Sequence, residues 1–575
     1  MADAFQVSGQ NSAAMFTLTL HRGDGMTLVA MNWKKGKPPQ DFVGFAIEYK
    51  EPGGSKVFPL RNRIAFPDAG GAMNPNTLST RLSPIQKFRW VHFPRNADLA
   101  GEFTYRVTPV FMNDKDELSY GETQEAAIEL RRETYPGQLN VTFTRGFVSS
   151  QAFVDRYVTE HDGIATLLPT KADEGLDFVP THPKAKEALT WMGFEARDAI
   201  LDLLDEAIKD KDAQVRVVAY DLSEREVVSR LKQLGKRLKI VIDDSAAHGK
   251  PDSAETRAEE RLKASAGDDS VKRQHMGSLQ HNKTIVVDGP KVQAVVCGST
   301  NFSWRGFFVQ SNNAVVLRGK TAVKPFLAAF EDYLLNQDVP GFGKTASARF
   351  SDLKLKGIDA QVAFSPHSPQ NALLTKIALD IGQQTTSNVF YSLAFLFQTE
   401  GAIKEAIKKV TANNAIFVYG ISDRKVGGLD LQKPDGNVAP VFPAALTKNL
   451  PEPFKSEPTG LSGNVGTRMH HKFVVIDFDK PTARVYLGSY NFSTPADVQN
   501  GENLLLVRDR RIAVSYVVEA LRIFDHYHFR VVQLEAKAAK KTLQLAKPPQ
   551  KPGDKPWWTE YYTEARKIRD RELFA

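Results

Sequence analysis

Two stretches of sequence decide the fold: HNKTIVVD at residues 281–288 and HHKFVVID at residues 470–477. Each reads His-x-Lys, then four residues that are mostly β-branched or aromatic, then Asp. Such an apolar run predicts a buried strand. Side chains two positions apart on a strand point to the same face. We therefore expect the imidazole and the ammonium of each stretch to project together and to carry chemistry.

A second motif follows each stretch at nearly the same distance. The strings are GSTNFS at residues 298–303 and GSYNFS at residues 488–493. Their asparagines, Asn301 and Asn491, lie 20 and 21 residues after the first histidine of each stretch. One such motif would be weak evidence, but two paired copies indicate an internal duplication.

The aspartates that close the two stretches, Asp288 and Asp477, are expected to be structural. Each lies seven positions after its histidine, an odd offset that turns its side chain to the opposite face of a regular strand. At about 3.3 Å per residue, each also lies roughly 23 Å further along the strand. In the first copy, Asp288 begins an Asp-Gly pair that is typical of a hairpin turn. Neither aspartate should touch what the histidine and lysine touch.

The doubled His-x-Lys-x4-Asp motif with Gly-Ser-x-Asn resembles the phospholipase D superfamily, and the resemblance covers roughly residues 135–535. It implies two duplicated α/β domains packed with pseudo-twofold symmetry. It also implies a phosphodiesterase that forms a covalent phosphohistidine without metal or other cofactor, with His281 as the nucleophile and His470 as the acid/base. Members of the superfamily act on phospholipids, nucleic acids and other phosphodiesters, so the motifs indicate the chemistry more closely than the substrate.

The chemistry of a phosphodiester explains why two histidines are needed. One imidazole attacks phosphorus, while the other protonates the leaving oxygen and then deprotonates water. Because each copy supplies one motif histidine, we expect a single site at the interface of the two halves. Cationic and amide side chains from both copies are expected to surround a shared anion pocket: Lys283, Lys472, Asn301 and Asn491. The hydroxyls of Ser303 and Ser493 are further candidate donors.

The two halves differ eleven residues after each asparagine, where the first has Asn312 and the second has Glu502. A carboxylate can orient an imidazole and stabilise its charge, and members of the superfamily often have an acidic residue near this position. Glu502 is therefore a supporting residue, and the neutral Asn312 argues against a symmetric mechanism. His471 has odd parity relative to His470, so we expect it to point away as a packed or solvated histidine.

The composition is that of a normal soluble protein, and 575 residues predict about three domains. A net charge of +8 is a mild bias toward anionic partners. The single cysteine, Cys297, excludes an intrachain disulfide and suits a reducing compartment. The first residues lack a secretory signal, and the apolar run at 389–397 is too short to span a bilayer. We expect a cytoplasmic monomer that reaches any lipid substrate by peripheral membrane contact.

Residues 1–133 are predicted to form an all-β domain. Alternating runs such as those at 16–20 and 103–111 are separated by turn clusters. Their spacing predicts a β-sandwich, and residues 103–111 resemble a late strand of a fibronectin type III or immunoglobulin-like domain. We expect a packing appendage in preference to a binding module. No cluster of catalytic residue types occurs in these residues.

From residue 134 onward strands and helices alternate, which predicts two α/β domains with a largely parallel core, at 134–350 and 351–540. The polar stretch 246–274 is interpreted as a surface insertion with a helical piece, which could overhang the site. Residues 426–466 are interpreted as a long loop that shapes substrate choice. The Pro/Lys-rich and aromatic tail at 541–575 is expected to fold back onto its parent domain.

Three functions are compatible with these patterns. The first is hydrolysis of a phospholipid head-group phosphodiester, which we place first. The second is a nuclease of the same superfamily, because the basic balance would suit a nucleic-acid backbone, although no nucleic-acid-binding module is recognisable in the sequence. The third is a non-catalytic binding protein with a degenerate site, in which the β-domain does the binding.

Overall fold

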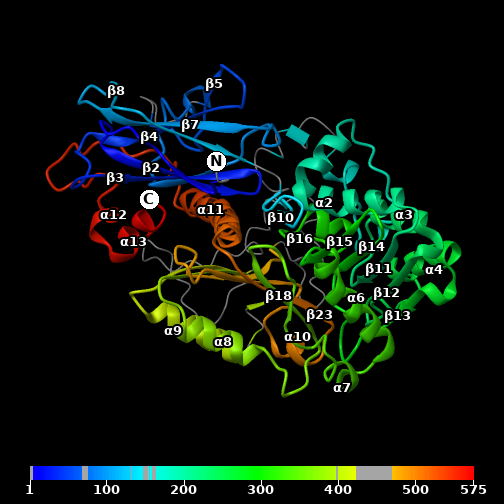
Figure 1. The fold of residues 1–575 in the computed structure, drawn as a ribbon. Helices are drawn as coiled ribbons and strands as arrows, with labels where there is room; N and C mark the ends of the chain where they lie inside the picture. The colour runs from blue at the N-terminus through cyan, green and yellow to red at the C-terminus, as the bar shows by residue number, and fades with distance from the viewer. Residues whose placement is uncertain are drawn as a thin grey trace.

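The computed structural model describes residues 4–67, 75–130, 133–146, 153, 156–157, 163–396, 399, 401–422 and 469–575. Two β-sheets at the N-terminus are followed by two α/β halves, a long helix and a short helical tail (Figure 1). None of the described helices has the length and hydropathy of a membrane span. The predicted loop at 426–466 lies outside the described residues.

The N-terminal part consists of two antiparallel sheets. The first contains β1 (Gln6–Ser8), β2 (Phe16–Gly23), β3 (Met26–Trp33) and β6 (Arg89–His92). The second contains β5 (Val57–Pro59), β4 (Phe42–Lys50), β7 (Glu102–Met112), β8 (Leu118–Tyr120) and β9 (Gln124–Glu129). Side chains of both sheets share one apolar cluster, because alternate residues of each strand face inward. The likeness to fibronectin or immunoglobulin domains stays a prediction.

The two α/β halves repeat one arrangement of elements. The first half contains β10 (Leu139–Phe143), α2 (Ala185–Lys209), β11 (Gln214–Ala219), α3 (Arg225–Leu234), β12 (Leu238–Ile242), α4 (Ala254–Ala266), β13 (Val271–Arg273), β14 (Thr284–Asp288), β15 (Gln293–Gly298), α5 (Trp304–Phe308), β16 (Asn313–Arg318), α6 (Lys320–Leu335) and α7 (Val339–Phe342). The second contains β17 (Ser351–Asp352), β18 (Asp359–Ser365), α8 (Leu374–Gln383), β19 (Asn388–Leu393), α9 (Ala402–Ala412), β20 (Phe417–Ile421), β21 (Lys472–Ile476), β22 (Arg484–Gly488), α10 (Thr494–Val498), β23 (Glu502–Arg508) and α11 (Arg510–Ala538).

Strand order shows the duplication directly. The first sheet runs β10-β16-β15-β14-β11-β12-β13, and the second runs β17-β18-β23-β22-β21-β19-β20. Six consecutive strands correspond in the two orders, with β14 and β21 at equivalent positions. These interior strands carry the two His-x-Lys motifs at their starts, so the motifs occupy equivalent positions in the two sheets.

The predicted parallel core is wrong, because both sheets are mixed and mostly antiparallel. Only β11, β12 and β13 in the first sheet and β19 and β20 in the second pair in parallel. Consecutive strands such as β14 and β15 are joined by a short turn, which permits antiparallel pairing only. The five-residue helices α5 and α10 also connect antiparallel strands, so a helix between two strands did not imply a parallel crossover here.

The stretch 246–274 contains the predicted helical piece, but it belongs to the core of the first half and is not a surface insertion. Its helix α4 buries Ala254, Ala258 and Leu262 in the outer core of the first half, and β13 extends the sheet edge. These apolar residues lie four positions apart and form one helical stripe. The charged residues on the other face dilute the stripe in the sequence, which explains why the segment was interpreted as a surface insertion.

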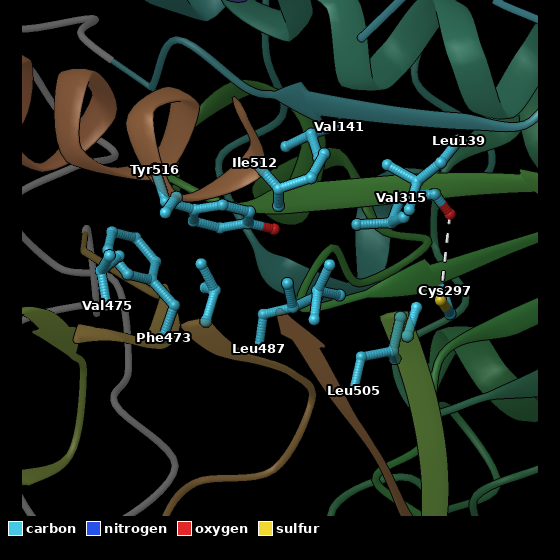
Figure 2. Packing of buried hydrophobic residues seen from close by; sticks show 14 of the residues in the cluster. Leu139, Val141, Cys297, Val315, Phe473, Val475, Leu487, Leu505, Ile512 and Tyr516 are labelled. Atoms are coloured by element: carbon cyan, nitrogen blue, oxygen red, sulfur yellow. Dashed lines mark hydrogen bonds between the residues drawn. The ribbon is translucent and has the colours of Figure 1, made fainter. Parts of the chain in front are cut away.

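The largest apolar cluster lies between the two halves and beneath α11. Figure 2 shows side chains that meet there from both sheets and from the helix. The labelled members are Leu139, Val141, Cys297 and Val315 of the first half, Phe473, Val475, Leu487 and Leu505 of the second, and Ile512 and Tyr516 of α11. Residues of β3, including Met26 and Leu28, join the same cluster. Apolar burial therefore holds the N-terminal sheets and both halves together.

The aromatic tail packs against the N-terminal sheets. The indole ring of Trp557 lies 5.7 Å from the ring of Phe42 and donates a hydrogen bond to its carbonyl oxygen. The ring of Tyr561 lies 5.1 Å from that of Phe88. Beyond α12 (Glu560–Thr563) and α13 (Ala565–Leu573), Phe574 enters the central cluster. The tail folds back as predicted, with Trp557 and Tyr561 on the first domain and Phe574 against Phe390, Phe417 and Phe478 of the second half.

Tyr516 provides a test of the shared core. Its ring makes edge contacts with Phe143 at 5.2 Å and Phe473 at 4.9 Å, one from each half. We expect Tyr516→Ala to lower the free energy of unfolding by about 3–5 kcal/mol, as other buried aromatic truncations do. The hydroxyl of Tyr516 is buried without a hydrogen-bond partner. Tyr516→Phe should therefore lower the free energy of unfolding by less than about 1 kcal/mol, or raise it. Denaturant midpoints measure both, and equal losses in the two variants would contradict this assignment.

Candidate functional site

The two motif histidines meet at the interface of the halves. His281 directly precedes the Asn-Lys pair that leads into β14, and His470 holds the equivalent position before β21. Their ring centroids lie 6.4 Å apart, with an interplanar angle of 69°. Both rings are buried. Reacting atoms approach to about 3–3.5 Å before reaction, so both rings are close enough to contact one phosphate group.

Each imidazole is held by the opposite half of the chain. The Nδ1 atom of His281 lies 2.8 Å from Oε2 and 3.0 Å from Oε1 of Glu502, at the start of β23. The Nδ1 atom of His470 lies 2.8 Å from Oδ1 of Asn312, just before β16. The partners differ as the sequence indicated, with a carboxylate for one ring and an amide for the other. The crossing of these bonds between halves was not foreseen.

Two buried serines of the Gly-Ser-x-Asn strings orient these partners. Ser489 donates to Oε2 of Glu502 at 2.7 Å, and Ser299 donates to Oδ1 of Asn312 at 3.0 Å. Asn312 also donates from Nδ2 to the carbonyl oxygen of Gly306 at 3.0 Å, so its amide oxygen faces the histidine. In both rings Nδ1 is therefore the donor, and Nε2 is the nitrogen left for chemistry. The serines belonged to the matching strings, but spacing alone assigned them no role.

The two motif lysines lie buried beside the histidines. Lys472 donates from Nζ to the carbonyl oxygen of His470 at 2.7 Å, and Lys283 donates to that of His281 in the same way. Burial lowers the pKa of Lys283 to about 7, although Glu502 and nearby aspartates oppose the effect. Burial and the charge of Lys283 lower the pKa of Lys472 well below its ordinary value.

The electrostatics of the histidines favour their neutral forms. Burial lowers the pKa of His281 to about 4, against the opposing charge of Glu502. Burial, followed by the charges of Lys472 and Lys283, lowers the pKa of His470 well below its ordinary value. The site thus places the two motif lysines in a desolvated space beside the carboxylate of Glu502. An anion bound between them would offset the repulsion and raise the pKa of every one of these groups.

The motif asparagines have unequal surroundings. Asn301 donates from Nδ2 to Oδ2 of Asp221 at 2.9 Å, so this carboxylate already engages its amide. In both Asn301 and Asn491 the Oδ1 atom is buried without a hydrogen-bond partner. Ser303 and Ser493 accept from backbone N–H groups at the starts of α5 and α10, at 3.1 and 3.4 Å. The structure gives these serines a capping role, and donation to a phosphate stays a prediction.

The motif aspartates and His471 make contacts that do not involve the two rings. Asp477 accepts hydrogen bonds from the backbone N–H groups of residues 386–388, which ties β21 to the start of β19. Asp288 accepts from Gln293 at 3.2 Å across the β14–β15 hairpin. His471 is buried and its Nε2 lies 2.9 Å from Glu519 of α11. These contacts agree with the parity argument.

A buried charge cluster beside the first motif was missed from the sequence. The two ring nitrogens of His248 lie 2.9 Å from Asp221 and 2.8 Å from Asp243. Burial lowers the pKa of His248, but its bonds to the two aspartates outweigh this and raise the pKa to about 10. The ring of Tyr220 lies 4.5 Å from that of His248 and 4.7 Å from that of His281. His248 comes from the stretch interpreted as an insertion, so sequence spacing could not connect it with Asp221.

Three side chains of this region are spaced as metal ligands would be, because ligand atoms of Asp221, His248 and Glu255 lie within 4.8 Å of one another. Both nitrogens of His248, however, are engaged by carboxylates. Arg305 lies 3.5 Å from Asp221 and adds a second positive charge. A protonated histidine is not a metal ligand, so these residues fit an internal ion-pair network better than a metal centre.

The lowered pKa of Lys283 can be tested through stability. Between pH 7 and 10.5 the unfolded chain binds a proton that folded Lys283 lacks, so the stability of the wild type rises with pH across this window. Lys283→Met removes this dependence. We expect the melting temperature of the variant, relative to wild type, to be highest near pH 7 and to fall toward pH 10. The control Lys239→Met, at an exposed position of β12, should differ from wild type in melting temperature by the same amount at every pH in this window. The same constant difference in Lys283→Met would contradict a lowered pKa of Lys283.

Comparisons with known proteins identify similar sequences and structures. A family model described as "Cardiolipin synthase, PLD-like domain" matches residues 201–334 and 385–524. "Phospholipase D" of Rickettsia prowazekii is 44% identical over 48 residues, which are 8% of this chain and 22% of that protein. The match therefore spans well under two thirds of the relative. The corresponding protein of Rickettsia felis is 42% identical over 48 residues, with the same coverage.

Two solved structures are also similar. Phosphatidylserine synthase from Haemophilus influenzae is 15% identical, with coverage of 66% of this chain and 93% of that chain and a TM-score of 0.39. The phospholipase D family member Nuc from Salmonella typhimurium is 29% identical, with coverage of 25% and 88% and a TM-score of 0.21. Since the family model matches each half over the segment that carries its paired motifs, the chain belongs to the phospholipase D superfamily.

Proposed function

We propose that the protein hydrolyses the head-group phosphodiester of a phospholipid through a phosphohistidine at His281. The observation that carries the proposal is the pair of rings 6.4 Å apart, each held at Nδ1 by a residue of the opposite half. This arrangement presents two Nε2 atoms to one phosphate from two sides. No other cluster in the described residues combines two such rings with two buried lysines.

The first step forms a covalent bond to the enzyme. Nε2 of His281 attacks phosphorus, the bond from phosphorus to the head-group oxygen breaks, and His470 gives its Nε2 proton to the leaving oxygen. Glu502 stabilises the positive charge that develops on the His281 ring. Lys283 and Lys472 hold the nonbridging oxygens. The negative charge of the bound diester offsets the lysines that lower the pKa of His470, so the acid form becomes accessible.

The second step releases phosphatidic acid. His470 takes a proton from a water molecule, the water oxygen attacks phosphorus, and the bond between phosphorus and Nε2 of His281 breaks. An alcohol in place of water would give a new phosphodiester by the same route. The family-model description, which names a synthase, supports a test for this transfer as well as for hydrolysis.

A lipid substrate is proposed ahead of nucleic acid on two grounds. The curated relatives that match are named phospholipase D, and the net charge of +8 over 575 residues is modest for a nucleic-acid-binding protein. The proposed site does not depend on this choice, because both substrate classes present a phosphodiester monoanion to the same two rings.

The substrate class is tested with two assays run side by side in EDTA. We expect choline release from phosphatidylcholine vesicles, exchange of the head group when ethanol is added, and no degradation of plasmid DNA. Plasmid cutting without choline release would support the nuclease alternative, and the absence of both would support the non-catalytic one. A large loss of activity caused by EDTA would contradict the metal-free mechanism.

The roles of the two histidines are tested with a p-nitrophenyl phosphodiester, whose leaving group needs no proton. We expect His470→Asn to release about one equivalent of nitrophenolate and to accumulate a phosphoenzyme, because the general base for water is missing. We expect His281→Asn to release essentially none, with turnover lowered by at least about 10³-fold. His275→Asn, at a more exposed histidine, is the matched control. Accumulation of phosphoenzyme in His281→Asn instead would reverse the assignment.

The contribution of the carboxylate is tested with Glu502→Gln, which keeps the shape of the side chain. We expect turnover to fall by about 10- to 100-fold, a loss similar to that seen when the carboxylate partner of a metal-bound histidine is removed. Asn312→Ala, which removes only a neutral partner of His470, should have a smaller effect on the nitrophenolate burst. Rapid single-turnover measurements give the burst rate of each variant. An unchanged burst rate in Glu502→Gln would contradict a role of Glu502 in the first step.

A further inference from the structure

A second cavity, of about 380 Å³, lies where the N-terminal sheets, the first half and α11 meet. Its lining contains none of the motif residues. Six cationic side chains line it: Arg63, Lys87, Arg95, Arg145, Arg156 and Arg522. Trp90, Phe93 and Trp191 supply aromatic surface, and Asp525 is the one carboxylate among the described lining residues. The cavity is therefore basic and aromatic, and the proposed reaction does not use it.

The described ion pairs leave Arg145 without a carboxylate. Asp525 pairs with Lys87 at 3.4 Å and with Arg89 at 2.9 Å, and Arg156 pairs with Glu187. For Arg145, by contrast, no ion pair to a described residue exists, and its Nε is buried without a hydrogen-bond partner. Burial lowers its pKa to about 9, the charge of Arg522 adds to the effect, and the charges of Glu195 and Glu519 oppose it. A buried guanidinium that has no direct ion pair with a described carboxylate can still accept a bound anion.

Aromatic rings fix the position of this guanidinium. It lies 4.8 Å from the ring centroid of Phe93, 4.6 Å from that of Trp191 and 4.4 Å from that of Phe194. Phe194 interrupts α2 with φ of 47° and ψ of −143°, a conformation that bulky residues rarely adopt. The break in the helix therefore places a ring against Arg145 at a conformational cost.

We propose that this cavity binds a small organic phosphate, with the phosphate group on Arg145 and Arg522 and an apolar or planar portion against Trp90 and Phe93. Guanidinium groups bind phosphate oxygens through paired N–H donors, which suits them to this role. The volume is at the lower end of that of small-molecule sites, which fits a nucleoside monophosphate better than a polymer. This site is independent of the proposed catalytic function.

A short chain of hydrogen bonds connects the cavity with the catalytic motif. Arg522 donates a hydrogen bond to Glu519. Glu519 also accepts a hydrogen bond from His471, the residue next to His470. Arg522 further donates to the carbonyl oxygen of Arg145 at 3.2 Å. A phosphate on Arg522 would therefore compete with Glu519 for the same guanidinium.

The test uses quenching of tryptophan fluorescence in the full chain, because Trp90 and Trp191 line this cavity. The probes are AMP and, separately, inorganic phosphate. We expect saturable quenching by at least one probe, weakened at least tenfold in Arg145→Gln and several-fold in the double variant Lys87→Gln/Arg156→Gln. His281→Asn should leave the binding unchanged, as should the matched control Arg508→Gln, on β23 at an exposed position. These two variants separate this site from the catalytic one.

The outcomes decide the proposal and the source of the ligand. Equal affinities for the two probes would identify the phosphate group alone as the ligand, whereas tighter binding of AMP that is lost in Trp90→Leu would show that a planar portion is bound as well. The lack of quenching by both probes, or unchanged affinity in folded Arg145→Gln, would overturn the proposal. If circular dichroism shows that Arg145→Gln does not fold, the double variant decides, since Lys87 and Arg156 are partly exposed; unchanged affinity there would overturn it equally.

Discussion

The hydrogen bond between His281 and Glu502 crosses from one half of the chain to the other, and the rest of the site depends on it. Glu502 is fully buried, and a buried carboxylate is costly unless it is well paired. Here it accepts from the imidazole and from Ser489. These bonds form only if the two sheets keep a fixed relation, which the apolar cluster around α11 provides. Packing and chemistry are therefore coupled at one interface.

The same burial sets the electrostatic character of the site. Two lysines and two imidazoles share a space from which water is largely excluded, and burial is the largest influence on the pKa of each. The site is thus suited to binding negative charge. The Asp221–His248–Asp243 network adds charge beside the first motif, while Phe395 stands near His470 and Lys472 in the second. The surroundings of the two histidines differ in both partner and polarity.

Much of this arrangement could be predicted from the sequence, because it depends on local repeats. Matching strings around residues 281 and 470 predicted a duplication and a shared site, and odd and even parity separated the chemical side chains from Asp477 and His471. Other features depend on contacts distant in sequence. Which half holds which ring, and the approach of His248 to Asp221, follow only from the three-dimensional packing. Strand direction was misjudged because the sequence rhythm does not distinguish a crossover from a hairpin with a short helix.

The unequal partners Asn312 and Glu502 have a consequence for how such a site can diversify. Two identical half-length chains meeting on a rotation axis would have to present the same residue at both positions, so any substitution there would alter both rings at once. A single continuous polypeptide is free of that constraint. Its two copies can be selected independently, with one ring tuned by a charge and the other by a dipole. The covalent joining of the halves is thus what permits one imidazole to specialise in attack and its counterpart in proton transfer.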